Sequence, residues 1–214
     1  MSIPFFCILI AYAAASVYDT ISAGTGRKRV MKPLLMPILF LLCCVYWQDT
    51  SKEFVFPLLG GVFCGWLGDV FLLRKGDTWF AGGLLSFLLG HIFYAFMFLS
   101  RAAGLVPVVP EATAAGVYVG ILIITAMRLV PVSPGKLKVP VVCYMGAILS
   151  MSYTALLFAA AHTDFGWLSF VGSAAFVISD LTLYAGVLKK KNDGAVVMGT
   201  YTAAQLLIAL GILL

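Results

Sequence analysis

The chain has 214 residues, of which 62% are hydrophobic and 11% are charged, whereas soluble domains contain about 45–50% apolar and about 25% charged residues. A soluble domain of this length exposes too much surface to accommodate so many apolar side chains, so the composition excludes a soluble globular protein. The formal net charge of +5 does not indicate nucleic acid as a partner, because the basic residues form no extended patch. We predict an all-α, polytopic membrane bundle.

Eight apolar segments, separated by polar residues, are predicted to be transmembrane helices. Because a membrane-spanning helix needs about 20 apolar residues, eight of them use most of the chain, and we expect a single transmembrane domain over residues 1–214. The second segment is short, and the Pro-rich stretch 104–110 is expected to be a loop or a short interfacial turn. In chain order the predicted helices cover residues 3–22, 33–47, 54–73, 79–99, 113–130, 138–161, 166–188 and 195–214.

The charges of the predicted loops indicate how the bundle is oriented. Loops with many Lys and Arg residues stay in the cytoplasm, so both termini are predicted to be non-cytoplasmic. Because no Lys or Arg precedes Arg27, the first segment lacks the positive start of a secretory signal and is expected to be retained. We expect a multi-pass protein of a bacterial-type cytoplasmic (inner) membrane. The even-numbered loops hold only Lys52 and Arg101, whereas the odd-numbered loops hold Arg27, Lys28, Arg29, Lys32, Arg74, Lys75, Arg128, Lys136, Lys138, Lys189, Lys190 and Lys191.

Four ionisable residues lie inside the apolar segments: Asp19, Asp69, His91 and Asp180. Such residues cost roughly 2.5–3.5 kcal/mol on insertion scales and are functional candidates for that reason. Asp69 and Asp180 come late in helices predicted to run inward, while His91 and Gln205 lie near the middle of helices predicted to run outward. Asp69, Asp180, His91 and Gln205 are therefore predicted to lie at the same depth, between the midplane and the cytoplasmic face. This agreement predicts a common internal site.

Structural roles remain open for the same residues. Asp19 lies near a membrane edge, a position compatible with contact to the interface alone, while Asp69 and Asp180 are compatible with a purely structural role as hydrogen-bonded links between helices. His91 is equally compatible with a packed interior histidine, and Lys32 with an ordinary interfacial anchor. The five cysteines lie within apolar stretches without metal-site spacing, so we expect buried thiols, no disulfide and no metal or other cofactor.

The polar residues, together with nearby aromatic and glycine residues, resemble the YhhN/TMEM86 family of lysoplasmalogenase-like integral membrane proteins. The resemblance extends from the second predicted helix to the last, and only the second aromatic residue expected beside Tyr201 is missing, since Thr200 and Thr202 stand there. It is carried by Lys32-Pro33, Gly68-Asp69, Phe80, Gly83, Phe87, Gly90-His91, Tyr94, Phe176, Ser179-Asp180, Tyr201 and Ala204-Gln205.

The resemblance implies an eight-helix hydrolase that cleaves the vinyl ether bond of lysoplasmalogens, giving a fatty aldehyde and glycerophospho-ethanolamine or -choline. This reaction needs a general acid, a base that activates water and negative charge near an oxocarbenium ion. We hypothesise that Asp69 and Asp180 form the acid/base pair, with either one as the acid, and that His91 orients or activates water. Lys32 is predicted to contact the phosphate, and the remaining substrate-binding residues are expected to be Tyr94, Ser179, Tyr201 and Gln205.

Two other classes of protein also fit the pattern. A secondary transporter of a lipid-like or small solute places Asp and His residues in its translocation path near the midplane. A non-catalytic membrane scaffold explains the composition but not the shared depth of the polar residues. The expected partners are a lysophospholipid substrate and membrane lipids, and no obligate protein partner is evident.

Overall fold

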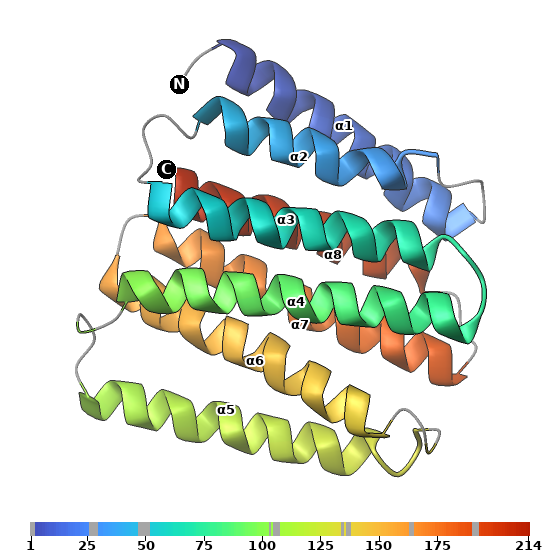
Figure 1. The fold of residues 1–214 in the computed structure, drawn as a ribbon, viewed down its shortest axis with the longest axis vertical. Coiled ribbons are helices and arrows are strands. Elements are labelled where there is room, and N and C mark those ends of the chain that lie inside the picture. Colours follow the sequence, from blue (N-terminus) through green and yellow to red (C-terminus); the bar gives the residue numbers. More distant parts are fainter. Residues whose placement is uncertain are drawn as a thin grey trace.

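The computed structural model describes residues 3–25, 30–46, 52–102, 104, 108–133, 135, 138–162, 165–189 and 193–214, and in these ranges the chain forms eight α-helices (Figure 1). Each helix coincides closely with one of the predicted apolar segments, so the all-α prediction is confirmed. The helices are α1 (Ile3–Thr25), α2 (Lys32–Tyr46), α3 (Lys52–Leu72), α4 (Asp77–Ala102), α5 (Val108–Leu129), α6 (Lys138–Ala161), α7 (Gly166–Lys189) and α8 (Gly194–Leu213).

Seven helices in the described part of the chain are long and apolar enough to cross a membrane, so the protein is a multi-pass membrane protein. The exception is α2, which was predicted as an eighth span. It has 15 residues, and at 1.5 Å per residue it is about 22 Å long, which is less than the hydrocarbon core of a bilayer, about 30 Å. The helix is apolar after Lys32 and contains Pro37 in its interior.

The prediction for the Pro-rich stretch 104–110 is partly wrong. Gly104 is a turn residue with a φ of +76°, but α5 already begins at Val108 and includes Pro110. Proline is tolerated in the first turn of a helix, where the missing N–H has no partner within the helix, so the last residues of this stretch belong to α5.

Six of the loop cations from which the membrane orientation was predicted lie outside the described residues. They are Arg27, Lys28, Arg29, Lys136, Lys190 and Lys191.

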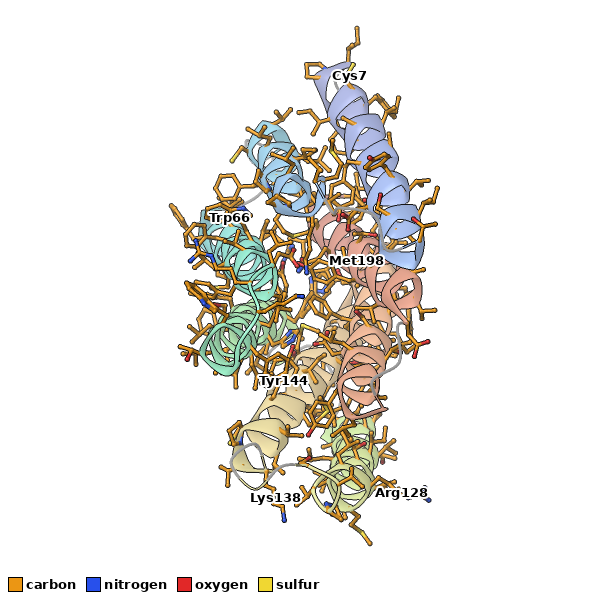
Figure 2. The ribbon with its side chains drawn as sticks, turned by 90° about the vertical axis from the view of Figure 1, so that its right-hand side faces the viewer. Cys7, Trp66, Arg128, Lys138, Tyr144 and Met198 are labelled. Carbon is orange, nitrogen blue, oxygen red and sulfur yellow. The ribbon has the colours of Figure 1, made fainter. Side chains whose placement is uncertain are left out.

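The helices lie side by side in a long bundle, in which α1 and α2 form one edge and α5 forms the other (Figure 1). The most extensive helix contacts are those of α7 with α8, α3 with α4, and α4 with α6. Helix α5 packs mainly against α6. The central helices α3, α4, α6, α7 and α8 therefore enclose the interior, and the side chains of this region are visible in the end-on view of Figure 2.

Two glycines allow the central helices to approach each other closely. A Cβ atom on Gly61 of α3 would lie 2.3 Å from the ring of Tyr94 on α4, and one on Gly172 of α7 would lie 2.9 Å from backbone atoms of Ala204 and Ile208 on α8. Small residues at such positions are a common feature of helix contacts in membranes. Each glycine precedes an aspartate of the predicted site by eight residues on the same helix. Each aspartate therefore belongs to a helix that packs closely against its neighbour, α3 against α4 and α7 against α8.

Candidate functional site

The first carboxylate, Asp69 on α3, lies between α2 and α8 and is 1% exposed. The Nζ atom of Lys32 is 3.2 Å from Oδ1 of Asp69, and the hydroxyl of Tyr201 donates a hydrogen bond of 2.8 Å to Oδ2. Lys32 is also buried, because it begins α2 and its side chain turns toward α3. Buried charges are tolerated when they are paired and hydrogen-bonded, and this ammonium balances the negative charge of Asp69.

The second carboxylate, Asp180 on α7, meets α4 and α6. The hydroxyl of Tyr144 donates a hydrogen bond to Oδ2 of Asp180, and Nε2 of His91 lies 3.1 Å from the same hydroxyl oxygen. Nε2 of His91 is also 3.4 Å from Oδ2 of Asp180. Figure 2 shows Tyr144 directed toward the interior of the bundle. These three side chains form one compact polar centre, which we call the Asp180 centre.

The hydrogen bonds of Tyr144 indicate which nitrogen of His91 carries a proton toward it. A phenol has one proton, and Tyr144 gives it to Asp180, so its oxygen accepts a hydrogen bond from Nε2–H of His91. The opposite nitrogen, Nδ1, is buried and has no hydrogen-bond partner among the described atoms. Because buried polar atoms are nearly always satisfied, Nδ1 is a position suited to a polar atom of a ligand or a water molecule.

A third pair of polar side chains lies next to Asp69. The hydroxyl of Tyr94 donates a hydrogen bond of 2.7 Å to Oε1 of Gln205, and Gln205 is one helical turn after Tyr201 on α8. A Cβ atom on Gly65 would lie 3.0 Å from Nε2 of Gln205 and 3.3 Å from the hydroxyl of Tyr201. The absence of a side chain at Gly65 therefore gives these polar groups their space beside α3.

Aromatic rings connect the two carboxylate centres. The ring of Phe176 lies 4.7 Å from that of His91 and 5.4 Å from that of Tyr201, both measured between centroids and both edge-on. Phe87 approaches Tyr201 from α4 at 5.8 Å. Phe176 is therefore in contact with one member of each centre, and the predicted residues Asp69, His91 and Asp180 are gathered around one aromatic cluster.

The remaining predicted residues occupy different positions. Ser179 donates its hydroxyl to the carbonyl oxygen of Val197 at 3.0 Å, so it links α7 to α8 and is not bonded to either carboxylate. Asp19 is fully buried on α1, which contradicts the interpretation that it reaches the membrane interface. The hydroxyl of Tyr12, on the same helix, donates to the carbonyl oxygen of Thr202 at 2.9 Å.

The sequence interpretation missed Tyr144. Its hydroxyl donates a hydrogen bond to Asp180, and it is also in contact with His91. The available signal was a single phenol in the first half of α6, a helix whose only Lys, Arg, Asp, Glu or His residue is Lys138 at its start. A lone tyrosine in an apolar helix has no spacing that identifies its partner, because the partner is on another helix.

A small pocket opens beside the Asp180 centre. Its volume is about 30 Å³, which is enough for roughly one or two water molecules. Asp180 and Tyr144 line it together with apolar residues of α3, α4, α6 and α7. In the described parts of the chain, no three His, Cys, Asp or Glu side chains are grouped as a metal ion would require.

Comparison with known proteins identifies the family to which the chain belongs. The profile of the YhhN family matches residues 27–212. Human lysoplasmalogenase TMEM86A is 29% identical over 214 residues, which cover 97% of this chain and 86% of the relative. Lysoplasmalogenase TMEM86B of Sus scrofa is 26% identical over 218 residues, which cover 98% of this chain and 84% of the relative. No solved structure matches the chain. The chain belongs to the YhhN family.

Proposed function

We propose that this protein is a membrane-embedded, lysoplasmalogenase-type hydrolase that cleaves the vinyl ether bond of a lysoplasmalogen. The products are a fatty aldehyde and glycerophospho-ethanolamine or -choline. Two observations support the proposal: the names of the relatives that align along nearly the whole chain, and two buried carboxylate centres joined through Phe176. The second observation carries the mechanism, because the reaction requires a proton donor and a separate negative charge.

The Asp180 centre supplies the proton in this proposal. Asp180 and His91 lie 3.4 Å apart and are joined through the Tyr144 hydroxyl, and an additional proton held by this pair is the one that is transferred. The pair donates the proton to the alkene carbon that is not bonded to oxygen. The other alkene carbon, which carries the ether oxygen, then becomes part of an oxocarbenium ion, as in glycoside cleavage.

Asp69 stabilises the cation. Lys32 balances its charge at 3.2 Å and Tyr201 donates to it at 2.8 Å, so Asp69 stays a carboxylate and offers fixed negative charge during the reaction. The faces of Phe87 and Phe176 add to this effect, because aromatic rings attract cations. The two aspartates, left interchangeable in the sequence analysis, thus take different roles.

Water completes the reaction from the small pocket beside Asp180 and Tyr144. It adds to the carbon of the oxocarbenium ion and returns a proton to the Asp180–His91 pair, which has changed from acid to base. The hemiacetal then breaks its bond to the glycerol oxygen, which takes up the hydroxyl proton. One water molecule is consumed, and the aldehyde and the glycerophospho compound are released.

Lys32 has a second role in the proposal, as the cation that holds the substrate phosphate. An ammonium has three donors, and the ion pair with Asp69 leaves others for a phosphate at the start of α2. Tyr94, Tyr201 and Gln205 line the glycerol region, while Ser179 supports α7 against α8. We also propose that α2, which packs against α1 and α3, crosses the membrane despite its length, so that eight crossings leave both termini non-cytoplasmic, and that the membrane is a bacterial-type cytoplasmic membrane, which the loop charges support.

Product analysis in heavy water tests the proposed chemistry. Purified protein in detergent is supplied with lysoplasmenylethanolamine in D₂O, and the aldehyde is analysed by mass spectrometry. Protonation of the alkene carbon places one deuterium on the carbon next to the carbonyl group, and this result is expected. A folded protein that releases no aldehyde, but that drives solute uptake in proteoliposomes, would replace the enzyme with the transporter alternative.

A further inference from the structure

An apolar groove runs between α2 and α3. Its volume is about 450 Å³, far larger than that of the pocket at Asp180. Leu41 and Phe63 are 57% and 49% exposed, so the groove is open laterally to the hydrocarbon of the membrane. Its walls are formed by Met36, Phe40 and Leu41 of α2 and by Val62, Phe63 and Trp66 of α3.

One end of this α2–α3 groove borders the first carboxylate. Met36 is four residues after Lys32 on α2, and Trp66 is three residues before Asp69 on α3, so each pair shares a helix face. The indole N–H of Trp66 donates a hydrogen bond of 3.0 Å to the carbonyl oxygen of Pro33, which joins the two walls beside the Lys32–Asp69 ion pair. A chain lying in the groove thus ends at a buried cation and a carboxylate.

Gly65 brings the floor of the groove close to the polar side chains. A Cβ atom on Gly65 would lie 3.7 Å from Sδ of Met36, which lines the groove, and 3.0 Å from Nε2 of Gln205. Gly65 is therefore next both to a wall residue of the groove and to the polar side chains of α8.

We propose that the α2–α3 groove binds the hydrocarbon chain of a single-chain phospholipid, with the phosphate at Lys32 and the vinyl ether beside Asp69. This inference rests on the proposed function and names the subsite that holds the chain. The charge and polarity match the ligand, which has an anionic group, then glycerol, then a long apolar chain. Because the groove is open sideways, the chain enters from the bilayer without leaving an apolar medium. The pocket at Asp180, at about 30 Å³, has room for water but not for such a chain.

A bulky substitution in the groove tests the proposal. Leu41→Trp places a larger side chain in the half-exposed wall of the groove. The measured quantity is the kcat/KM for a long-chain lysoplasmalogen divided by the kcat/KM for a short-chain one. This ratio is expected to fall about tenfold, which is the effect of a methylene-sized change in an apolar pocket. Ile123→Trp is the matched control, because Ile123 is 54% exposed on α5 and lies outside the groove. An unchanged ratio in Leu41→Trp, or an equal change in the control, overturns the proposal.

Photolabelling tests binding of a lipid chain in the groove independently of hydrolysis. A lysophosphatidylethanolamine with a diazirine on its acyl chain carries no vinyl ether, so its binding does not depend on hydrolysis. Peptide mapping is expected to find the label on α2 and α3, displaced by unlabelled lysolipid and reduced in Leu41→Trp. If aldehyde is formed but the label maps to α4, α6 and α7, the groove proposal is wrong and the enzyme proposal stands. If the groove is labelled and no vinyl ether is cleaved, the enzyme proposal fails instead.

Discussion

Tyr144 donates its single hydroxyl proton to Asp180, and its oxygen therefore accepts a hydrogen bond from His91 at 3.1 Å. One phenol thus fixes the positions of both proton-carrying groups of the Asp180 centre, although it lies on a third helix. The proton transfer proposed above depends on this arrangement, because a carboxylate without a donor rotates more freely and shares its proton less well with the imidazole.

Replacing Tyr144 with phenylalanine is expected to lower kcat while the protein stays folded. A hydrogen bond to a charged group contributes about 1.5–3 kcal/mol, which corresponds to a loss of roughly 10- to 100-fold in rate. The measurement is the rate of aldehyde release at saturating substrate, with thermal stability in detergent recorded beside it. Tyr153→Phe is the control on the same helix, because the Tyr153 hydroxyl makes only a long bond of 3.3 Å to the backbone of Glu111. Equal rates in wild type and Tyr144→Phe would remove Tyr144 from the mechanism.

Lys32→Met is expected to destabilise the fold, because it leaves the carboxylate of Asp69 buried without its ammonium partner. Breaking one member of a buried ion pair costs about 3–5 kcal/mol. The double variant Lys32→Met/Asp69→Asn should recover most of the stability and still be inactive, since both the phosphate-binding cation and the carboxylate are gone. Thermal unfolding of the two variants checks this, and a double variant no more stable than Lys32→Met would show that the pair has no such coupling.

Gly65→Ala is expected to impair catalysis more than folding. The added methyl group would lie 3.0 Å from Nε2 of Gln205 and 3.3 Å from the Tyr201 hydroxyl, so both polar groups must shift by a few tenths of an ångström. Misplacement on this scale costs about tenfold in kcat/KM. Gly116→Ala is the matched control, because nothing lies within 4 Å of a Cβ atom there. Similar kcat/KM values in both variants would mean that the space beside Gly65 is not part of the site.

The orientation inferred from the loop charges predicts where the carboxyl terminus lies. A phosphatase that is active only outside the cytoplasm should be active when fused after Leu214, and a fluorescent protein that fails to mature there should remain dark. Fusions within the α3–α4 connection, near Arg74 and Lys75, should behave in the opposite way. Identical behaviour at the two positions would show that the orientation, or the number of crossings, is different.

The helices were predictable because the apolar runs are long and are interrupted by polar residues. The shared depth of Asp69, His91, Asp180 and Gln205 also followed from chain direction alone, and the structure brings these residues together. The length of α2 was harder to predict. Its 15 residues are as apolar as those of the other helices, but they are fewer than a membrane-spanning helix normally has.

The pairing within the site was not predictable from the sequence. Chain order shows that Lys32 precedes Asp69, but not that its Nζ is 3.2 Å from that carboxylate, because this distance depends on how α2 packs against α3. The same reason explains why Tyr144 was missed and why Asp19, which lies near the end of α1, proved to be fully buried. Contacts between helices are set by packing, and a single sequence contains little information about it.

The most direct test of the account is the time course of aldehyde release by the purified protein in detergent, supplied with lysoplasmenylethanolamine and read with a coupled aldehyde reductase. The wild type should release aldehyde without any ion gradient and in the presence of EDTA. Asp180→Asn, which cannot supply the shared proton, should be slower by roughly 10²–10⁴-fold and should elute from gel filtration as the wild type does. Aldehyde release at the wild-type rate by Asp180→Asn, or none by well-folded wild type, would contradict the account.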